Sequence, residues 1–139
     1  MNGHFLVVDD NQPTRALIGE FLKSLGRSFD EAANGNEAIK LIQSHSFDGI
    51  FLDVLMPESD GFEVLNWMVR NKTILPTVVF TEAKAKFDVD FPAMAESLGA
   101  LKGYDKPVTL QKIQAGLEVM DKLKLSGAAS LSPAGLSVR

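Results

Sequence analysis

The chain has 139 residues, 45% of them hydrophobic and 23% charged, which is ordinary for one soluble globular domain and excludes wholesale disorder and coiled coils. Its formal net charge of −4 disfavours direct binding to nucleic acid or to an anionic membrane. It has no cysteine, which excludes disulfides and thiolate zinc sites. Because no apolar run reaches the roughly 18 residues of a membrane span and no secretory signal is visible, we expect a cytoplasmic domain without membrane insertion.

Apolar, strand-like runs alternate with amphipathic, helix-like segments along the chain. In chain order, strands are predicted at 5–8, 27–32, 49–52, 77–80 and 101–105, of which the second is the weakest. Helices are predicted where apolar residues recur at helical spacing, around 17–25, 38–42, 62–68, 93–98 and 110–120. Repeated strand–helix units favour a parallel sheet with helices on both faces.

One domain is predicted, over residues 1–125. Residues 126–139 consist mostly of Ser, Ala and Gly, with Pro133 and no acidic residue. We expect this segment to be a flexible tail or the start of a linker. A helical extension through Ala128 and Ala129 is the less favoured alternative.

Polar side chains follow the predicted strands at the points where they end. Asp9 and Asp10 follow the first strand, Asp53 the third, Thr81 the fourth and Lys106 the fifth. Ligands of open parallel sheets bind beyond the carboxyl ends of the strands, and adjacent strands lie about 4.8 Å apart, so these side chains are predicted to share one pocket. Each one alone is more often a cap, a turn residue or a surface group. Their ordered conjunction is what favours a functional site.

Three carboxylates in one pocket repel one another and need a cation. Since no His or Cys stands nearby, oxygen ligands favour Mg²⁺. Mg²⁺ and Lys106 would together balance the three aspartates and leave a near-neutral site that accepts an anionic phosphoryl group. One carboxylate can then act as the nucleophile and form an aspartyl phosphate, with the metal and the lysine neutralising the phosphoryl oxygens.

Several motifs together resemble the receiver domain of two-component response regulators, over residues 4 to about 122. They are Val7-Val8-Asp9-Asp10-Asn11, Ala32-Ala33-Asn34-Gly35-Asn36-Glu37-Ala38, Leu52-Asp53-Val54-Leu55-Met56-Pro57, Asp60-Gly61, Phe80-Thr81, Gly99-Ala100 and Lys106-Pro107. The resemblance implies an α/β fold of the flavodoxin-like, doubly wound kind. Its five-stranded parallel sheet would have the order 2-1-3-4-5 and carry five helices.

The resemblance also implies a role for each site residue. Asp53 would be the phosphoacceptor, and Thr81 the switch hydroxyl that moves toward the phosphoryl group. Lys106 would pair with that group, and the Lys106–Pro107 peptide bond would be cis. The ligands of Mg²⁺ would be Asp9, Asp10, Asp53 and the backbone carbonyl of Leu55.

The function implied is a phosphoaccepting signalling switch of a two-component phosphorelay, rather than an enzyme. A histidine kinase or a histidine phosphotransfer protein would donate the phosphoryl group from a phosphohistidine. A downstream protein target, or an output domain missing from this chain, would read the altered surface, with no direct contact to nucleic acid.

Three features depart from the family pattern. Gly103 stands where the family usually has the aromatic switch residue, and Tyr104 should point to the opposite face unless the strand bulges. The stretch from Thr81 to Gly99 is about three residues longer than usual, which indicates local packing or an altered partner surface. Leu55 and Ala83 flank the site where many relatives carry polar groups, so we expect slow spontaneous dephosphorylation.

Two alternatives remain open at this point. One is a pseudo-receiver, an interaction module that is never phosphorylated, which the glycine at position 103 leaves possible. The other is a phosphatase of the haloacid dehalogenase type, which also uses an aspartate after a strand. That family needs a second acid two residues further on, where this chain has Leu55.

Overall fold

The computed structural model describes residues 3–54, 61–81 and 90–125. The strands are β1 His4–Val8, β2 Ser28–Ala32, β3 Gly49–Asp53, β4 Thr77–Thr81 and β5 Lys102–Asp105. The helices are α1 Gln12–Ser24, α2 Gly35–Ser44, α3 Gly61–Arg70, α4 Phe91–Ser97 and α5 Leu110–Leu125. The tail expected at 126–139 lies outside the described residues. Within those residues, no helix is long and apolar enough to cross a membrane.

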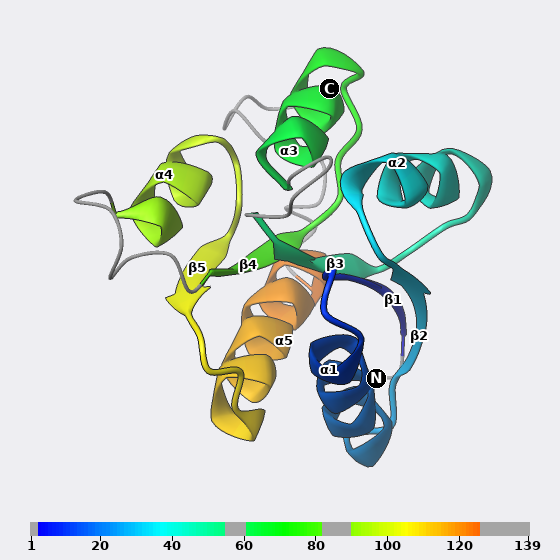
Figure 1. The fold of residues 1–139 in the computed structure, drawn as a ribbon, viewed down its shortest axis with the longest axis vertical. Coiled ribbons are helices and arrows are strands. Elements are labelled where there is room, and N and C mark those ends of the chain that lie inside the picture. Colours follow the sequence, from blue (N-terminus) through cyan, green and yellow to red (C-terminus); the bar gives the residue numbers. More distant parts are fainter. Residues whose placement is uncertain (1–2, 55–60, 82–89, 126–139) are drawn as a thin grey trace.

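The strands form one parallel sheet in the order β2-β1-β3-β4-β5, which confirms the predicted fold class. Figure 1 shows α1 and α5 on one face of the sheet and α2, α3 and α4 on the other. Because all strands run in the same direction, their carboxyl ends meet at one edge. That edge is where the predicted site residues were expected.

The core lies in two layers, one on each side of the sheet. Successive residues of a strand point to opposite faces. In β1, Leu6 and Val8 therefore pack toward α2, α3 and α4, while Phe5 and Val7 pack toward α1 and α5. All four are essentially fully buried, which explains why this run contains no polar residue.

Side-chain caps fix where three helices begin. Asn11 accepts from the backbone N–H of Thr14 at 2.9 Å at the start of α1, and Asn34 accepts from that of Glu37 at 2.9 Å at the start of α2. Asp90 accepts from the N–H of Ala93 at 3.0 Å at the start of α4. These bonds satisfy N–H groups that have no partner inside the helix.

The short helix predicted at 93–98 begins two residues earlier in the structure and spans Phe91–Ser97. It begins at Phe91 because Asp90 caps it and Pro92 lies in its first turn, where proline costs no hydrogen bond. Phe91 is buried and its ring packs near that of Phe62 on α3, with centroids 6.2 Å apart. This packing attaches the start of α4 to its neighbour.

Candidate functional site

Three aspartates meet at the carboxyl edge of the sheet. Asp9 follows β1 and is 1% exposed, Asp53 is the last residue of β3 and is 5% exposed, and Asp10 is exposed. One carboxylate oxygen from each lies within 4.8 Å of the others. β1 and β3 are neighbours with Val8 opposite Leu52, so the residues that follow them necessarily come together.

Lys106 brings a positive charge to this acidic cluster. Its ammonium donates to Oδ2 of Asp9 at 2.8 Å and lies 3.5 Å from Oδ2 of Asp53. The backbone N–H of Lys106 donates to the carbonyl of Thr81 at 2.8 Å, which holds the end of β5 against β4. The Lys106–Pro107 peptide bond is cis.

Both carboxylate oxygens of Asp9 accept hydrogen bonds. Oδ1 accepts from the backbone N–H of Asn11 at 2.9 Å, while Oδ2 accepts from Lys106. The backbone N–H of Asp9 donates to the carbonyl of Ala32 on β2 at 3.2 Å. A buried charge is stable only when it is paired and hydrogen-bonded, and this one is.

Thr81 ends β4 at the same edge and is fully buried. In the register of the sheet Asp53 lies opposite Phe80, so Thr81 stands one residue beyond it. The predicted backbone ligand Leu55, and Ala83, fall at positions outside the described residues.

The donor set fits Mg²⁺. Asp9, Asp10 and Asp53 offer carboxylate oxygens only, and Asp10 is open to solvent. Mg²⁺ takes few protein ligands and keeps several waters, so a partly open group of carboxylates suits it.

Gly61 is a site residue whose role the sequence did not reveal. It starts α3, and its N–H donates to the carbonyl of Val54 at 3.1 Å. A Cβ at this position would overlap the carbonyl oxygen of Asp53 and lie 2.7 Å from Cα of Val54. Only glycine allows α3 to approach the end of β3 this closely.

Arg15 is a second residue that sequence reasoning missed. It lies in α1, and its guanidinium donates to the backbone carbonyl of Asp9 at 2.7 Å. A basic residue near the start of the helix that follows the strand-end carboxylates is the signal that could have drawn attention to it.

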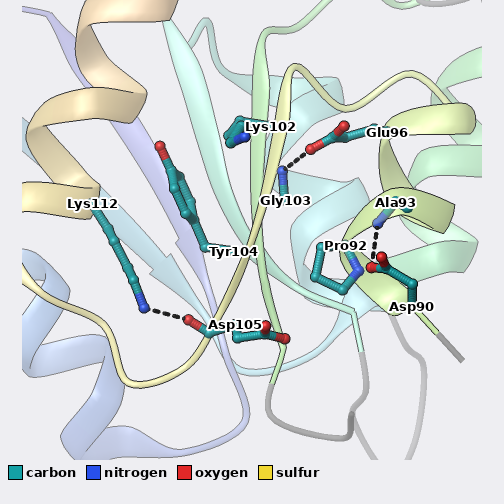
Figure 2. A pocket seen from close by; sticks show the side chains of 9 residues that line it. All are labelled: Asp90, Pro92, Ala93, Glu96, Lys102, Gly103, Tyr104, Asp105 and Lys112. Atoms are coloured by element: carbon teal, nitrogen blue, oxygen red, sulfur yellow. Dashed lines mark hydrogen bonds between the residues drawn. The ribbon is translucent and has the colours of Figure 1, made fainter. Parts of the chain in front are cut away.

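Gly103 and Tyr104 lie on opposite faces of β5 (Figure 2). A Cβ on Gly103 would lie 2.6 Å from Cα of Pro92, so α4 covers this face of the strand. The N–H of Gly103 donates to Oε2 of Glu96 at 2.8 Å. An aromatic side chain at position 103 would need α4 to move away.

The ring of Tyr104 packs on the face toward α5. It stacks on Phe80 with centroids 5.6 Å apart, and Nζ of Lys102 lies 5.6 Å from its centre. Burial, followed by the negative charges of Glu118 and Glu96, raises the pKa of Tyr104. Tyr104 is paired with Phe80 in regular register and Asp105 with Thr81, so no bulge turns the ring toward Thr81.

A surface cavity of about 450 Å³ lies between α4, β5 and α5. Figure 2 shows Asp90, Glu96, Lys102 and Lys112 around it, so both signs of charge line its walls. It is separate from the aspartate cluster, whose residues do not line it.

Comparison with known proteins agrees with this geometry. The family described as the response regulator receiver domain matches residues 5–118. The probable transcriptional regulator ycf27 of Cyanidium caldarium is 32% identical over 130 residues, which are 94% of this chain and 51% of that protein. Sporulation initiation phosphotransferase F of Bacillus subtilis is 29% identical over 124 residues, which are 89% of this chain and 98% of that protein.

A solved structure is also similar. The response regulator protein TrrA from Thermotoga maritima, crystallised in complex with Mg²⁺-BeF, has a TM-score of 0.70 and 28% identity, covering 84% of this chain and 97% of that one. The chain spans about half the length of the first curated relatives it matches. With the parallel 2-1-3-4-5 sheet and an aspartate cluster at its carboxyl edge, this match means that the chain belongs to the response regulator receiver domain family of two-component signalling.

Proposed function

We propose that this domain is a phosphorylation switch whose phosphoacceptor is Asp53. The observation that carries the proposal is the group of three carboxylates with Lys106 beside two of them. Of the three, Asp53 ends the central strand β3 and lies 3.5 Å from the lysine ammonium.

Transfer of the phosphoryl group from a phosphohistidine to Asp53 needs no further reactant. A carboxylate oxygen of Asp53 attacks the phosphorus of a phosphohistidine on a kinase or a phosphotransfer protein. The P–O bond forms as the P–N bond breaks, and the imidazole nitrogen of the donor takes the electron pair. The product is an acyl phosphate on Asp53 and an unmodified histidine on the donor.

Asp9, Asp10 and Asp53, with the backbone carbonyl of Leu55, would hold Mg²⁺. When bound, the cation neutralises the charge on the phosphoryl oxygens during transfer. Asp9 is already oriented by Asn11 and Lys106, whereas Asp10 is exposed to solvent.

Lys106 and Thr81 supply the remaining contacts to the phosphoryl group. The ammonium of Lys106, now shared between Asp9 and Asp53, would donate to a phosphoryl oxygen once Asp53 is modified. The hydroxyl of Thr81 would donate to another oxygen, and the movement this requires at the end of β4 would change the surface around β5.

The output partner is a protein, either a separate target or an output domain on a longer chain. Relatives such as ycf27 are transcriptional regulators by name, and this chain covers about half of that protein. The formal net charge of −4 gives no support to direct contact of this domain with nucleic acid. We place the domain in the cytoplasm, where histidine kinases present their phosphohistidine.

Labelling with a small phosphodonor tests the proposal. The wild-type chain and the variants Asp53→Asn and Glu20→Gln are incubated with acetyl phosphate and Mg²⁺. Glu20 is an exposed carboxylate on α1 that serves as the control. We expect labelling of the wild type and of the Glu20→Gln variant, and none of the Asp53→Asn variant. A wild-type chain that is folded by circular dichroism but not labelled would favour the pseudo-receiver alternative. A labelled Asp53→Asn variant would mean that another residue accepts the phosphate.

A further inference from the structure

Arg15 connects the aspartate cluster to the neighbouring strand. Its side chain is only 14% exposed although it lies on a surface helix. Nη1 donates to the backbone carbonyl of Asp9 at 2.7 Å, and Nε donates to Oε1 of Glu31 on β2 at 2.9 Å. The planar guanidinium is therefore held at two points, in a geometry that a lysine cannot reproduce.

The hydrogen bond to the carbonyl of Asp9 also orients the peptide unit that joins Asp9 to Asp10. The carbonyl of Asp9 and the N–H of Asp10 belong to one planar peptide unit, so an atom that holds one end sets the orientation of the other. Asp9 itself is further held by its N–H bond to Ala32 and by the N–H of Asn11. Arg15 is the contact in this set that acts on the peptide leading to Asp10.

Glu31 gives the guanidinium its direction. It stands opposite Val7 in the parallel register of β1 and β2, next to Ala32, whose carbonyl accepts from the N–H of Asp9. Its carboxylate accepts from Nε, which aims the Nη1 group at the turn between β1 and α1. The Glu31–Arg15 pair thus ties the turn to β2.

We propose that Arg15 is a positioning residue for divalent-cation binding, with Glu31 as its anchor. It holds the peptide between Asp9 and Asp10 so that the two carboxylates face the same ion. The proposal rests on the proposed function only in taking Asp9 and Asp10 as metal ligands. It concerns the binding of the ion and not the transfer of phosphate.

The sign of the effect separates positioning from charge. A cation at Arg15 repels Mg²⁺, so removing its charge without any positioning role would strengthen Mg²⁺ binding. Loss of positioning would instead weaken binding, by about tenfold where an outer contact orients a ligand. Arg15→Gln removes both the positive charge and the planar guanidinium that makes two hydrogen bonds. Arg15→Lys keeps the charge and removes only the guanidinium.

The test is calorimetric titration of the full chain with Mg²⁺ alone, in the absence of any phosphodonor. We expect the dissociation constant to rise about tenfold for Arg15→Gln and also to rise for Arg15→Lys. Lys23→Gln, which removes an exposed charge further along the same helix, should leave it unchanged. Unchanged or tighter binding by the Arg15→Gln variant would overturn the proposal, as would wild-type affinity in the Arg15→Lys variant.

Glu31 and Asp10 can be tested in the same titration. Glu31→Gln should weaken Mg²⁺ binding more in the wild type than in the Arg15→Gln background, since loss of the negative charge is common to both and the anchor acts only through the guanidinium. An equal effect in both backgrounds would contradict the proposed anchor. Asp10→Asn tests the metal site itself. If this variant binds Mg²⁺ with wild-type affinity, Asp10 is not a ligand. If it loses Mg²⁺ affinity while the Arg15→Gln variant keeps wild-type affinity, the positioning role alone is refuted.

Discussion

Lys106 donates to Asp9 across the carboxyl edge of the sheet, at 2.8 Å, although the two residues are 97 positions apart in the chain. Asp9 is 1% exposed and Lys106 is 12% exposed on the side chain, so solvent screens the pair weakly. This ion pair joins the end of β5 to the end of β1 across two intervening strands.

Removing the lysine should leave the buried Asp9 and Asp53 without their balancing charge. We expect Lys106→Met to lower the free energy of unfolding in the absence of Mg²⁺ by about 3 kcal/mol, because breaking a buried pair strands the other charge. Lys124→Met, which breaks an exposed pair with Asp48, should change it by less than about 1 kcal/mol. Urea unfolding measures both, and equal losses would contradict the account of Asp9.

Gly103 should tolerate no side chain in this arrangement. A Cβ would lie 2.6 Å from both Cα and the carbonyl oxygen of Pro92, and backbone atoms cannot move aside as a flexible side chain can. Gly103→Ala is therefore expected to lower the free energy of unfolding by about 1–3 kcal/mol. Lys102→Ala, at the exposed preceding residue, is the control, and equal stability of the two variants would show that α4 shifts freely.

Tyr104 is the single tyrosine of the chain, so its ionisation can be followed by phenolate absorbance without assignment. Burial and the charges of Glu118 and Glu96 raise its pKa above the ordinary value of 10.0. Glu118→Gln should lower the pKa but leave it above that value, because burial is the larger cause. A Glu118→Gln variant that titrates at the ordinary value would assign the whole shift to charge.

Because its pKa is raised, Tyr104 makes the free energy of unfolding depend on pH in the alkaline range. The unfolded chain loses the tyrosine proton near pH 10.0, while the folded chain keeps it to higher pH. The contribution of Tyr104 is therefore fully present below that pH and is lost as pH rises toward the folded pKa. Urea unfolding should show that the free energy of unfolding falls more steeply across this pH range in the wild type than in the Tyr104→Phe variant. Parallel pH dependences of the two proteins would contradict this prediction.

Slow loss of the phosphoryl group is expected from Leu55 and Ala83. Neither side chain can hydrogen-bond an attacking water, so the phosphorylated domain should persist well beyond seconds after the donor is removed. Decay of labelled protein over time measures this directly. A half-life of seconds in the purified protein would show that another group orients the water.

The aspartate cluster could be predicted because it follows from parallel strands alone. Polar residues after buried runs must gather at one edge, which is where Asp9, Asp10 and Asp53 lie. The side-chain alternation of β5 likewise separates Tyr104 from Thr81 without knowledge of the packing around them.

Contacts between elements could not be predicted in the same way. The role of Gly61 depends on how closely α3 approaches β3, and that of Arg15 on a side chain that spans from α1 to β2. For Gly61 and Arg15 the determining partner is set by tertiary packing, which a local pattern does not contain. The start of α4 at Phe91 is different, because its signal is local: Asp90 caps the helix and Pro92 lies in its first turn.

Phosphorylation of Asp53 is tested most directly by peptide mapping with mass spectrometry, after the full chain has reacted with acetyl phosphate and Mg²⁺. We predict one modified peptide, with the phosphate on Asp53, and no modification when Mg²⁺ is chelated. Phosphate on Asp9 or Asp10, or equal labelling with and without Mg²⁺, would contradict the account.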